Sequence, residues 1–277
     1  MKDLRAAVIQ MRSGADRSAN LRTARELVLQ AAKQGAELVA LPEVVAWRGP
    51  KDQEVAQGET LQGPTVQALS AVAAEARVWI VGGSFLERLD GDDRCYNTAT
   101  LFAPDGDLVA SYRKIHLFDI DIPGQVSVRE SDTRRAGSET ICVETPFGRI
   151  GLAVCYDLRF PELFRRLADA GAEVVVMPSA FTLPTGRAHW HPLIRARAIE
   201  NQCYFLAPNQ FGSAAHDSAS PTGLAEYGHS LIVDPWGSIL AEAPEDTPAV
   251  IVADLDAALL AKVRRDLPSL EHRRLPT

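Results

Sequence analysis

Cys155 carries a nucleophilic thiol and lies at the boundary between an apolar segment and a polar one. The five residues before it, 150–154, are apolar and uncharged, which predicts a strand buried on both faces. Pro161 and Glu162 predict a helix start, because proline fits a first turn and an acid favours the positive end of the helix dipole. This order places a small nucleophile at the carboxyl end of a sheet strand, where open α/β sheets have their sites. The layout resembles a nucleophile elbow, although the G-x-S-x-G pattern is absent.

Cys155 taken alone is as well explained by a buried, inert thiol, because free cysteines are among the most buried residues. Thiol catalysis also needs a base for the proton and a positive or donor group for the oxyanion. Glu43 follows a predicted strand, 36–41, and is surrounded by apolar residues, so it is a candidate base. Lys114 ends a predicted strand and is a candidate cation. Taken singly, a capping Glu43 and a solvated Lys114 are the commoner roles.

Histidine is the usual base for a thiol, and six are present: His116, His189, His191, His216, His229 and His272. His189 and His191 flank Trp190 like a metal-binding pair. However, this segment is predicted to begin a helix, where residues i and i+2 do not share a face, and no nearby cysteine or acid completes a ligand set. We therefore expect no metal site, with His189 packing or capping at a helix start and His116 bonded to backbone at a strand end.

The elements that must position these residues alternate between strand and helix. The predicted strands are 4–10, 36–41, 78–83, 96–102, 108–114, 140–145, 150–155, 174–177, 204–207, 228–234, 239–242 and 250–254. The predicted helices are 16–34, 65–76, 161–171, 188–201 and 257–267. Residues 119–137 are predicted to form a long functional loop and residues 211–227 a surface loop. The order predicts an α/β fold with mixed sheets, and the absence of a linker predicts one domain over residues 1–277.

Composition excludes several classes of protein. The chain has 277 residues, 46% of them hydrophobic, and a net charge of −7, which is typical of a globular protein and argues against nucleic acid as a partner. No apolar run reaches the length of a membrane span, and the first residues lack a signal-peptide pattern, so we expect a cytoplasmic protein without membrane partners. The other cysteines, Cys95, Cys142 and Cys203, are widely spaced and are expected to be core thiols, not disulfides.

Taken together, Glu43, Lys114 and Cys155 resemble the Glu-Lys-Cys triad of the nitrilase (carbon–nitrogen hydrolase) superfamily. The matching motifs are Leu-Pro-Glu43, Tyr-Arg-Lys114-Ile-His-Leu-Phe and Gly-Leu-Ala-Val-Cys155-Tyr-Asp-Leu-Arg-Phe-Pro-Glu. Further matches are Pro-Ser-Ala-Phe from 178, Ala-His-Trp from 188, Arg-Ala-Arg-Ala-Ile-Glu from 195, Tyr-Gly-His-Ser from 227 and Asp-Pro-Trp-Gly from 234. Several motifs in the same order over nearly the whole chain make the resemblance specific.

The resemblance implies a four-layer α-β-β-α sandwich that forms a homodimer or larger homo-oligomer. It implies that Cys155 is the nucleophile and Glu43 its general base. Lys114 and the backbone N–H of Tyr156 would stabilise the oxyanion, and Glu130 would orient the substrate and Lys114. A charged Lys114 would favour the thiolate form of Cys155. The resemblance implies no metal and no organic cofactor.

Within the superfamily the motifs are most similar to the Nit branch, above all to the deaminated glutathione amidases. That resemblance implies hydrolysis of deaminated glutathione to 2-oxoglutarate and Cys-Gly. The ω-amidases, which deamidate 2-oxoglutaramate, are also similar, so both substrates are expected to require cationic groups in the acyl pocket.

Arg159, Arg187 and Arg195 are candidates for those groups by charge. For Arg159 and Arg195 we favour salt bridges to nearby acids or a solvated position. His191 stands where many members carry Glu, and Arg187 where many carry Pro. Either replacement would reshape the pocket mouth.

Other functions stay open from sequence alone. A nitrile hydrolase or another small-amide hydrolase could use the same triad, and a non-catalytic interaction protein could use the same fold. The basic residues at 262–265 and 272–274 are expected to be solvated or to make subunit contacts, with nucleic-acid binding as the weak alternative.

Overall fold

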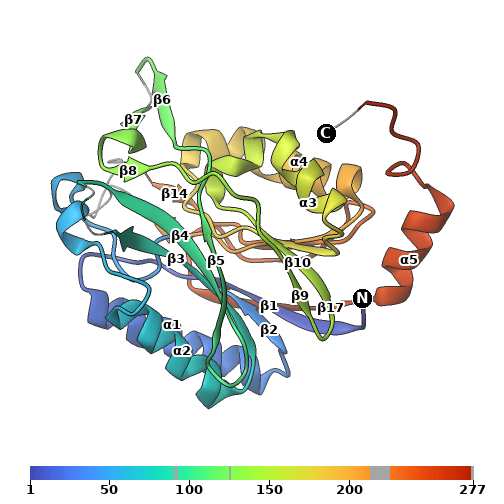
Figure 1. Cartoon of the computed structure of the whole chain (residues 1–277), viewed down its shortest axis with the longest axis horizontal. Coiled ribbons are helices and arrows are strands. Elements are labelled where there is room, and N and C mark those ends of the chain that lie inside the picture. Colours follow the sequence, from blue (N-terminus) through green and yellow to red (C-terminus); the bar gives the residue numbers. More distant parts are fainter. Residues whose placement is uncertain (90, 92, 125, 213–224, 276–277) are drawn as a thin grey trace.

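Two β-sheets lie face to face between two pairs of helices (Figure 1). This computed structural model describes residues 1–89, 91, 93–124, 126–212 and 225–275. One outer layer contains α1 (Arg17–Lys33) and α2 (Pro64–Ala76), and the other contains α3 (Pro161–Asp169) and α4 (Leu183–Asn201). The predicted α-β-β-α sandwich with mixed sheets is therefore confirmed.

Within the described residues, the first sheet has seven strands in the order β17-β1-β2-β3-β4-β5, with β8 beside β4. They are β1 (Leu4–Gln10), β2 (Leu38–Ala40), β3 (Trp79–Arg88), β4 (Cys95–Phe102), β5 (Leu108–Arg113), β8 (Arg134–Arg135) and β17 (Ala249–Leu255). β1, β2 and β3 run parallel because α1 and α2 provide the crossovers. β17, β4 and β5 add antiparallel edges.

The second sheet has the order β16-β15-β12-β11-β10-β9 in the described part of the chain. Its strands are β9 (Cys142–Thr145), β10 (Gly148–Leu152), β11 (Val174–Val176), β12 (Tyr204–Ala207), β15 (Leu231–Val233) and β16 (Ile239–Glu242). β10, β11 and β12 are parallel, and α3 and α4 connect them. The remaining elements are α5 (Ala257–Asp266), the short 3-10 helices η1 (Lys51–Gln53), η2 (Val55–Gln57), η3 (Glu130–Asp132) and η4 (Cys155–Arg159), and the short strands β13 (Phe211–Gly212) and β14 (Glu226–Tyr227).

Alternation along β1 builds two cores at once. Leu4, Ala6 and Val8 face the second sheet and join its apolar residues in one large cluster. Ala7 and Ile9 face the opposite way and pack in a second cluster with residues of α1 and α2. Because successive strand residues point to opposite faces, a fully apolar strand is the expected pattern for a sheet covered on both sides.

The prediction of a structureless loop over 119–137 is wrong. β6 (Asp119–Ile122) and β7 (Val126–Arg129) form an antiparallel hairpin that stands out from the sandwich, and η3 and β8 follow it (Figure 1). Four of these strand residues are exposed and only Val126 is buried. Apolar and polar residues alternate in both strands, as in a half-buried strand, but each run is only four residues long, so the pattern is weak in the sequence.

α4 also begins earlier than predicted, at Leu183 instead of residue 188, with Pro184 in its first turn. His189 and His191 therefore lie inside the helix and not at its start. The predicted surface loop 211–227 is described only at its ends, where β13 and β14 pair, and residues 213–224 lie outside the described residues.

All four cysteines are free, as predicted, and Cys95 and Cys203 are buried. Among the described helices, none combines the length and apolarity that crossing a membrane requires. That residues 1–277 form a single domain stays a prediction.

Gly83 shapes the segment that follows β2. Its φ is +65°, and a Cβ atom there would lie 2.1 Å from the carbonyl oxygen of Pro42. The register of β3 against β4 shifts at this point, and the next residue, Ser84, accepts backbone N–H bonds from Val44 and Val45 through its hydroxyl and its carbonyl. A glycine at 83 therefore allows the chain around Glu43 to approach β3 closely.

We expect Gly83→Ala to lower the free energy of unfolding by about 3 kcal/mol or more, because a left-handed backbone penalty adds to a clash with backbone. Gly91→Ala is the matched control, since Gly91 also has a positive φ but has no atom near its would-be Cβ. The control should lose only about 1 kcal/mol. Urea unfolding of both variants measures the difference, and equal losses would contradict the close-approach argument.

Candidate active site

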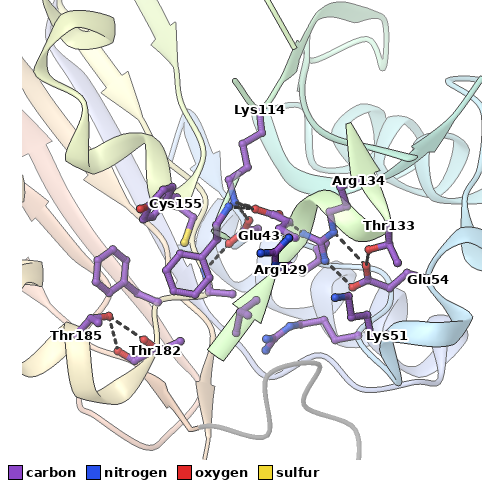
Figure 2. A pocket seen from close by; sticks show the side chains of 18 residues that line it. Glu43, Lys51, Glu54, Lys114, Arg129, Thr133, Arg134, Cys155, Thr182 and Thr185 are labelled. Carbon is purple, nitrogen blue, oxygen red and sulfur yellow. Dashed lines mark hydrogen bonds and ion pairs between the residues drawn. The ribbon is translucent and has the colours of Figure 1, made fainter. Parts of the chain in front are cut away.

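Four sequence-predicted residues meet where the two sheets come together (Figure 2). Glu43 follows β2 and Lys114 follows β5, both in the first sheet, whereas Cys155 follows β10 in the second. Glu130 opens η3, beyond the β6–β7 hairpin. All four are buried, with Lys114 only 1% exposed and Cys155 8% exposed. The structure thus brings together residues that lie up to 112 positions apart in the chain, counted from Glu43 to Cys155.

Three donors fix the Glu43 carboxylate. Its Oε1 accepts from Asn97 Nδ2 at 2.7 Å and from Lys114 Nζ at 3.2 Å. Its Oε2 accepts from the backbone N–H of Ala180 at 2.8 Å. Because Asn97 lies on β4 and Ala180 follows β11, groups from both sheets hold the carboxylate in one orientation.

The segment 178–180 holds both Glu43 and Cys155. The carbonyl of Pro178 accepts from the Cys155 N–H at 2.9 Å, and the carbonyl of Ser179 accepts from the Glu43 N–H at 3.3 Å. With the Ala180 N–H on the carboxylate, three consecutive residues bond the thiol-bearing residue and the acid.

Lys114 lies between two carboxylates. Its Nζ is 3.2 Å from Glu43 Oε1, and 2.8 and 3.1 Å from the two oxygens of Glu130. Burial acts to lower the pKa of Lys114, but the Glu130 and Glu43 carboxylates raise it well above its ordinary value. Lys114 therefore stays charged throughout the physiological range.

Glu130 belongs to a chain of buried charges. Besides Lys114, it accepts from Arg134 Nη1 at 2.5 Å and from the N–H of Phe118 at 2.6 Å. Arg134 in turn donates to Glu54, whose other oxygen bonds Thr133. Burial acts to raise the pKa of Glu130, but Lys114 and Arg134 lower it to about 2.

Cys155 opens η4 with φ of +46°, in the left-handed region that residues with side chains seldom adopt. Its sulfur points toward the same centre as Lys114 Nζ and Glu43 (Figure 2). Burial and the Glu43 carboxylate raise the pKa of the thiol well above its ordinary value, and Lys114 offsets only part of that rise. Lys114 therefore acts in the expected direction, toward the thiolate, but burial and Glu43 outweigh it.

Asp157 holds the turn that presents Cys155. It is fully buried and accepts from the Val154 N–H at 2.8 Å and from the Tyr112 hydroxyl at 2.7 Å. His116 Nδ1 lies 2.7 Å from its Oδ1 and the ring stacks on Phe160, so the His116 side chain bonds a buried carboxylate instead of the backbone that was expected. The sequence shows Asp157 only as a polar residue soon after Cys155. Its burial in the structure reveals this role.

Tyr156 is the second residue of η4, where backbone N–H groups have no acceptor within the helix. Its ring packs edge-to-face on Phe118, with centroids 5.0 Å apart, and both residues line the pocket. The N–H of Tyr156 thus belongs to the turn that directly follows the thiol-bearing residue.

The pocket beside Cys155 combines apolar and cationic side chains. Its lining includes Phe118, Val128, Tyr156 and Phe181, the hydroxyls of Thr182 and Thr185, and the cations Arg48, Lys51, Arg129 and Arg134. Arg48 pairs with Glu226 at 2.6 Å, and Lys51 with Asp132 at 2.6 Å. Sequence reasoning missed these four cations, because basic residues in loops have the same pattern as solvated ones.

The three arginines proposed from charge are not among the lining residues. Arg159 lies over the rings of Tyr156 and Phe181, 5.6 and 5.3 Å from their centroids, instead of bridging a nearby acid. Arg195 donates to the carbonyl of Gly237.

The two departures from the family pattern also lie away from the pocket. Arg187 lies 3.5 Å from Glu245, and His191 bonds Glu242 at 2.9 Å. Neither lines the pocket, so the predicted reshaping of its mouth is not seen.

Comparisons with known proteins agree with this geometry. Residues 5–265 match the carbon-nitrogen hydrolase family model. A deaminated glutathione amidase from Synechocystis sp. is 42% identical over 276 residues, 99% of each chain. The mouse omega-amidase NIT2 is 41% identical over 275 residues, covering 99% of this chain and 96% of that protein.

Solved structures give the same result. The C. elegans NitFhit protein superposes with a TM-score of 0.89 at 37% identity, covering 99% of this chain and 66% of that longer one. Nit3 of Saccharomyces cerevisiae, described as a member of branch 10 of the nitrilase superfamily, has a TM-score of 0.88 at 34% identity, covering 99% of this chain and 97% of that one.

Alkylation of Cys155 by iodoacetamide should be slow at pH 7 and should still be accelerating above pH 9, because burial and Glu43 raise the pKa of its thiol. Glu43→Gln removes a negative charge and should move the midpoint of the pH profile downward. Peptide mass spectrometry measures labelling at Cys155, with half-buried Cys142 as internal reference. A flat profile from pH 7 to 10 would contradict the electrostatic argument.

Glu130 should contribute a pH-dependent part of the stability. Its pKa of about 2 in the folded protein lies below its ordinary 4.5, so it stabilises the fold above pH 4.5 and loses this effect as pH falls toward 2. The shift corresponds to about 3 kcal/mol.

Glu130→Gln should therefore be less stable than the parent by about 3–5 kcal/mol at pH 7, because it leaves Lys114 and Arg134 without a carboxylate. The difference in the free energy of unfolding between the two proteins should narrow between pH 4.5 and 2. Urea unfolding across that range measures this difference, and a difference that stays constant would contradict the lowered pKa of Glu130.

Proposed function

The chain belongs to the carbon–nitrogen hydrolase family, and we propose that it hydrolyses a 2-oxoglutaryl amide through an acyl-thioester on Cys155. The family resemblance drawn from the motifs is confirmed, and with it the reaction class of a carbon–nitrogen hydrolase acting on amides. The roles of individual residues and the substrate are proposals.

The observation that carries the mechanism is a buried thiol beside a carboxylate and a lysine that is held between two carboxylates. Because burial and Glu43 favour the protonated form of the thiol, attack requires a base within reach. We assign that role to Glu43, whose carboxylate is fixed by Asn97 and Ala180 and faces the same centre as the sulfur. As the sulfur bonds the amide carbon, Glu43 takes the thiol proton.

The carbonyl oxygen of the substrate becomes an oxyanion in this step. We assign its stabilisation to Lys114, charged and held in place, and to the backbone N–H of Tyr156. When the tetrahedral intermediate collapses, the C–N bond breaks and Glu43 gives its proton to the leaving nitrogen. The acyl group remains on Cys155 as a thioester.

Water completes the cycle. Glu43, again ionised, removes a proton from a water molecule that attacks the thioester carbon. The C–S bond breaks, the acid leaves, and the proton returns to the Cys155 sulfur. Glu130 bonds Lys114 through both oxygens, so we assign it the positioning of the lysine.

The pocket and the relatives support an anionic substrate. Arg48 and Arg134 are each buried and paired with acids, whereas Arg129 is exposed and Lys51 pairs with a half-exposed Asp132. Lys51 and Arg129 are therefore the cations best placed to accept a carboxylate. Deaminated glutathione and 2-oxoglutaramate share a 2-oxoglutaryl group with such a carboxylate.

Deaminated glutathione, split to 2-oxoglutarate and Cys-Gly, is our first candidate because relatives at 42–43% identity carry that activity in their names. The ω-amidase reaction on 2-oxoglutaramate is the second, supported by the mouse relative at 41%. A nitrilase proper has no such support, and a non-catalytic interaction protein would have no need of a buried thiol among hydrogen-bonded ion pairs.

We also propose a homodimer in the cytoplasm. Exposed apolar side chains gather on α4 and the neighbouring β15–β16 hairpin: Ile199, Trp236, Ile239 and Leu240. Ile199 and the hairpin are adjacent, since a Cβ on Gly237 would lie 2.6 Å from it. Such a patch is typical of a subunit interface, and light scattering gives the molar mass that tests it.

Both amides should be tested side by side with the purified chain. Strong turnover of deaminated glutathione supports the first candidate, and preference for 2-oxoglutaramate supports the second. Cys155→Ala, Glu43→Gln and Lys114→Met should each lose at least about 1,000-fold in kcat/KM, and combining them should cost little more. Cys142→Ser is the matched thiol control and should keep full activity. Absence of turnover on both amides, and of an acyl adduct on Cys155 by mass spectrometry, would sink the proposal.

A further inference from the structure

Three side chains of metal-ligand type converge outside the catalytic pocket. They are His191 on α4, His229 just before β15, and Glu242 at the end of β16. His191 Nε2 lies 2.9 Å and His229 Nδ1 lies 2.7 Å from the same oxygen, Oε1 of Glu242. The three ligand atoms all lie within 4.8 Å of one another. None of the three residues lines the pocket beside Cys155.

Rigid elements hold the three residues. The Trp190 Nε1–H, next to His191, donates to the carbonyl of His229 at 2.8 Å, which ties α4 to the segment before β15. Glu242 pairs with Leu231 in the β15–β16 ladder. His229 has φ of +50°, so its ring is directed by an unusual backbone conformation. The ligand atoms are thus presented by a helix, a fixed turn and a strand, which suits a preorganised site.

The donor set indicates the class of ion. Two imidazoles and one carboxylate form a ligand set that Zn²⁺ uses with three protein ligands and one open position, and imidazole also suits other first-row divalent ions. The side chains are 28%, 23% and 33% exposed for His191, His229 and Glu242, so an ion can reach them from solvent.

An outer carboxylate completes the arrangement. Glu245 Oε2 lies 3.8 Å from His229 Nε2, the ring nitrogen that does not face Glu242. Metal-binding histidines usually present their second nitrogen to such an acceptor, which fixes the ring and its tautomer. Arg187 lies 3.5 Å from the other oxygen of Glu245 and holds that carboxylate in place.

We propose that His191, His229 and Glu242 bind one divalent first-row metal ion, with Zn²⁺ as the reference ion. The ion takes the place of the two hydrogens between the rings and the carboxylate, and each ring stays neutral with its proton on its other nitrogen, Nδ1 of His191 and Nε2 of His229. The ion thereby fastens α4 to the β15–β16 hairpin. Its expected effect is on stability. Trp190 packs on Phe181, with ring centroids 5.1 Å apart, and Phe181 lines the catalytic pocket. An ion that holds α4 to the hairpin therefore also stabilises one side of the pocket. The proposal does not depend on the identity of the substrate.

Calorimetric titration of metal-free protein with Zn²⁺ tests the site, in a Cys155→Ala background so that the catalytic thiol cannot bind the ion. We expect one ion per chain. His191→Ala, His229→Ala and Glu242→Gln should each weaken binding by about 100-fold or more, and Glu245→Gln by about 10-fold. His189→Ala is the matched control on the same helix, since His189 contacts Arg159 and not the cluster, and it should bind normally.

Thermal unfolding gives a second readout that does not depend on activity. Zn²⁺ should raise the Tm of the Cys155→Ala protein and leave that of His191→Ala unchanged. His191→Gln serves where the alanine variant does not fold. Absence of saturable binding would show that the three residues form only a hydrogen-bonded cluster. Binding that survives His191→Ala would place the ion elsewhere. Either result overturns the proposal.

Discussion

A buried ammonium group is the constraint on which the rest of the site depends. Lys114 is almost wholly removed from solvent, and an uncompensated charge there would cost several kcal/mol. Glu43 and Glu130 compensate it, Arg134 offsets the second carboxylate, and Glu54 balances Arg134. Three carboxylates against two cations leave one excess negative charge. A further anion is therefore unfavourable beside them, which together with burial raises the pKa of the Cys155 thiol.

Directional bonds around this centre connect the two sheets. The first sheet supplies Glu43 and Lys114, the second supplies Cys155, and the segment from η3 to β8 supplies Glu130 and Arg134. Apolar packing between the sheets is non-directional and tolerates small slides. The hydrogen bonds that join Glu43 to Ser179 and Ala180, which follow β11 of the second sheet, are directional, so they specify the relative position of the two sheets where atomic placement decides the chemistry.

Sequence reasoning succeeded where a local pattern carries the information. β1 was predictable because its central residues, Ala6 to Ile9, are apolar and suit burial on both faces, and the turn after β10 because Cys155 and Pro161 mark its two ends. Sequence reasoning failed where long-range contacts decide. The strands of the β6–β7 hairpin alternate apolar and polar residues over only four positions each, and the start of α4 depends on packing that a proline alone does not reveal.

The candidate site divides in the same way. Glu43, Lys114, Glu130 and Cys155 were identified through motifs, and the structure brings them together. The raised pKa of the thiol was not predictable, because it depends on how deeply the site is buried. Glu242 escaped notice because 51 residues separate it from His191.

The segment 178–180 has a mechanical consequence. Pro178 and Ser179 accept hydrogen bonds from the backbone of Cys155 and Glu43, and Ala180 donates to the Glu43 carboxylate. The nucleophile and the acid are therefore both attached to the same three-residue segment. A movement of one sheet relative to the other is then expected to displace both residues together, so that the distance between the thiol and the carboxylate changes little. Proton transfer between them would in that case be insensitive to fluctuations of the outer helices.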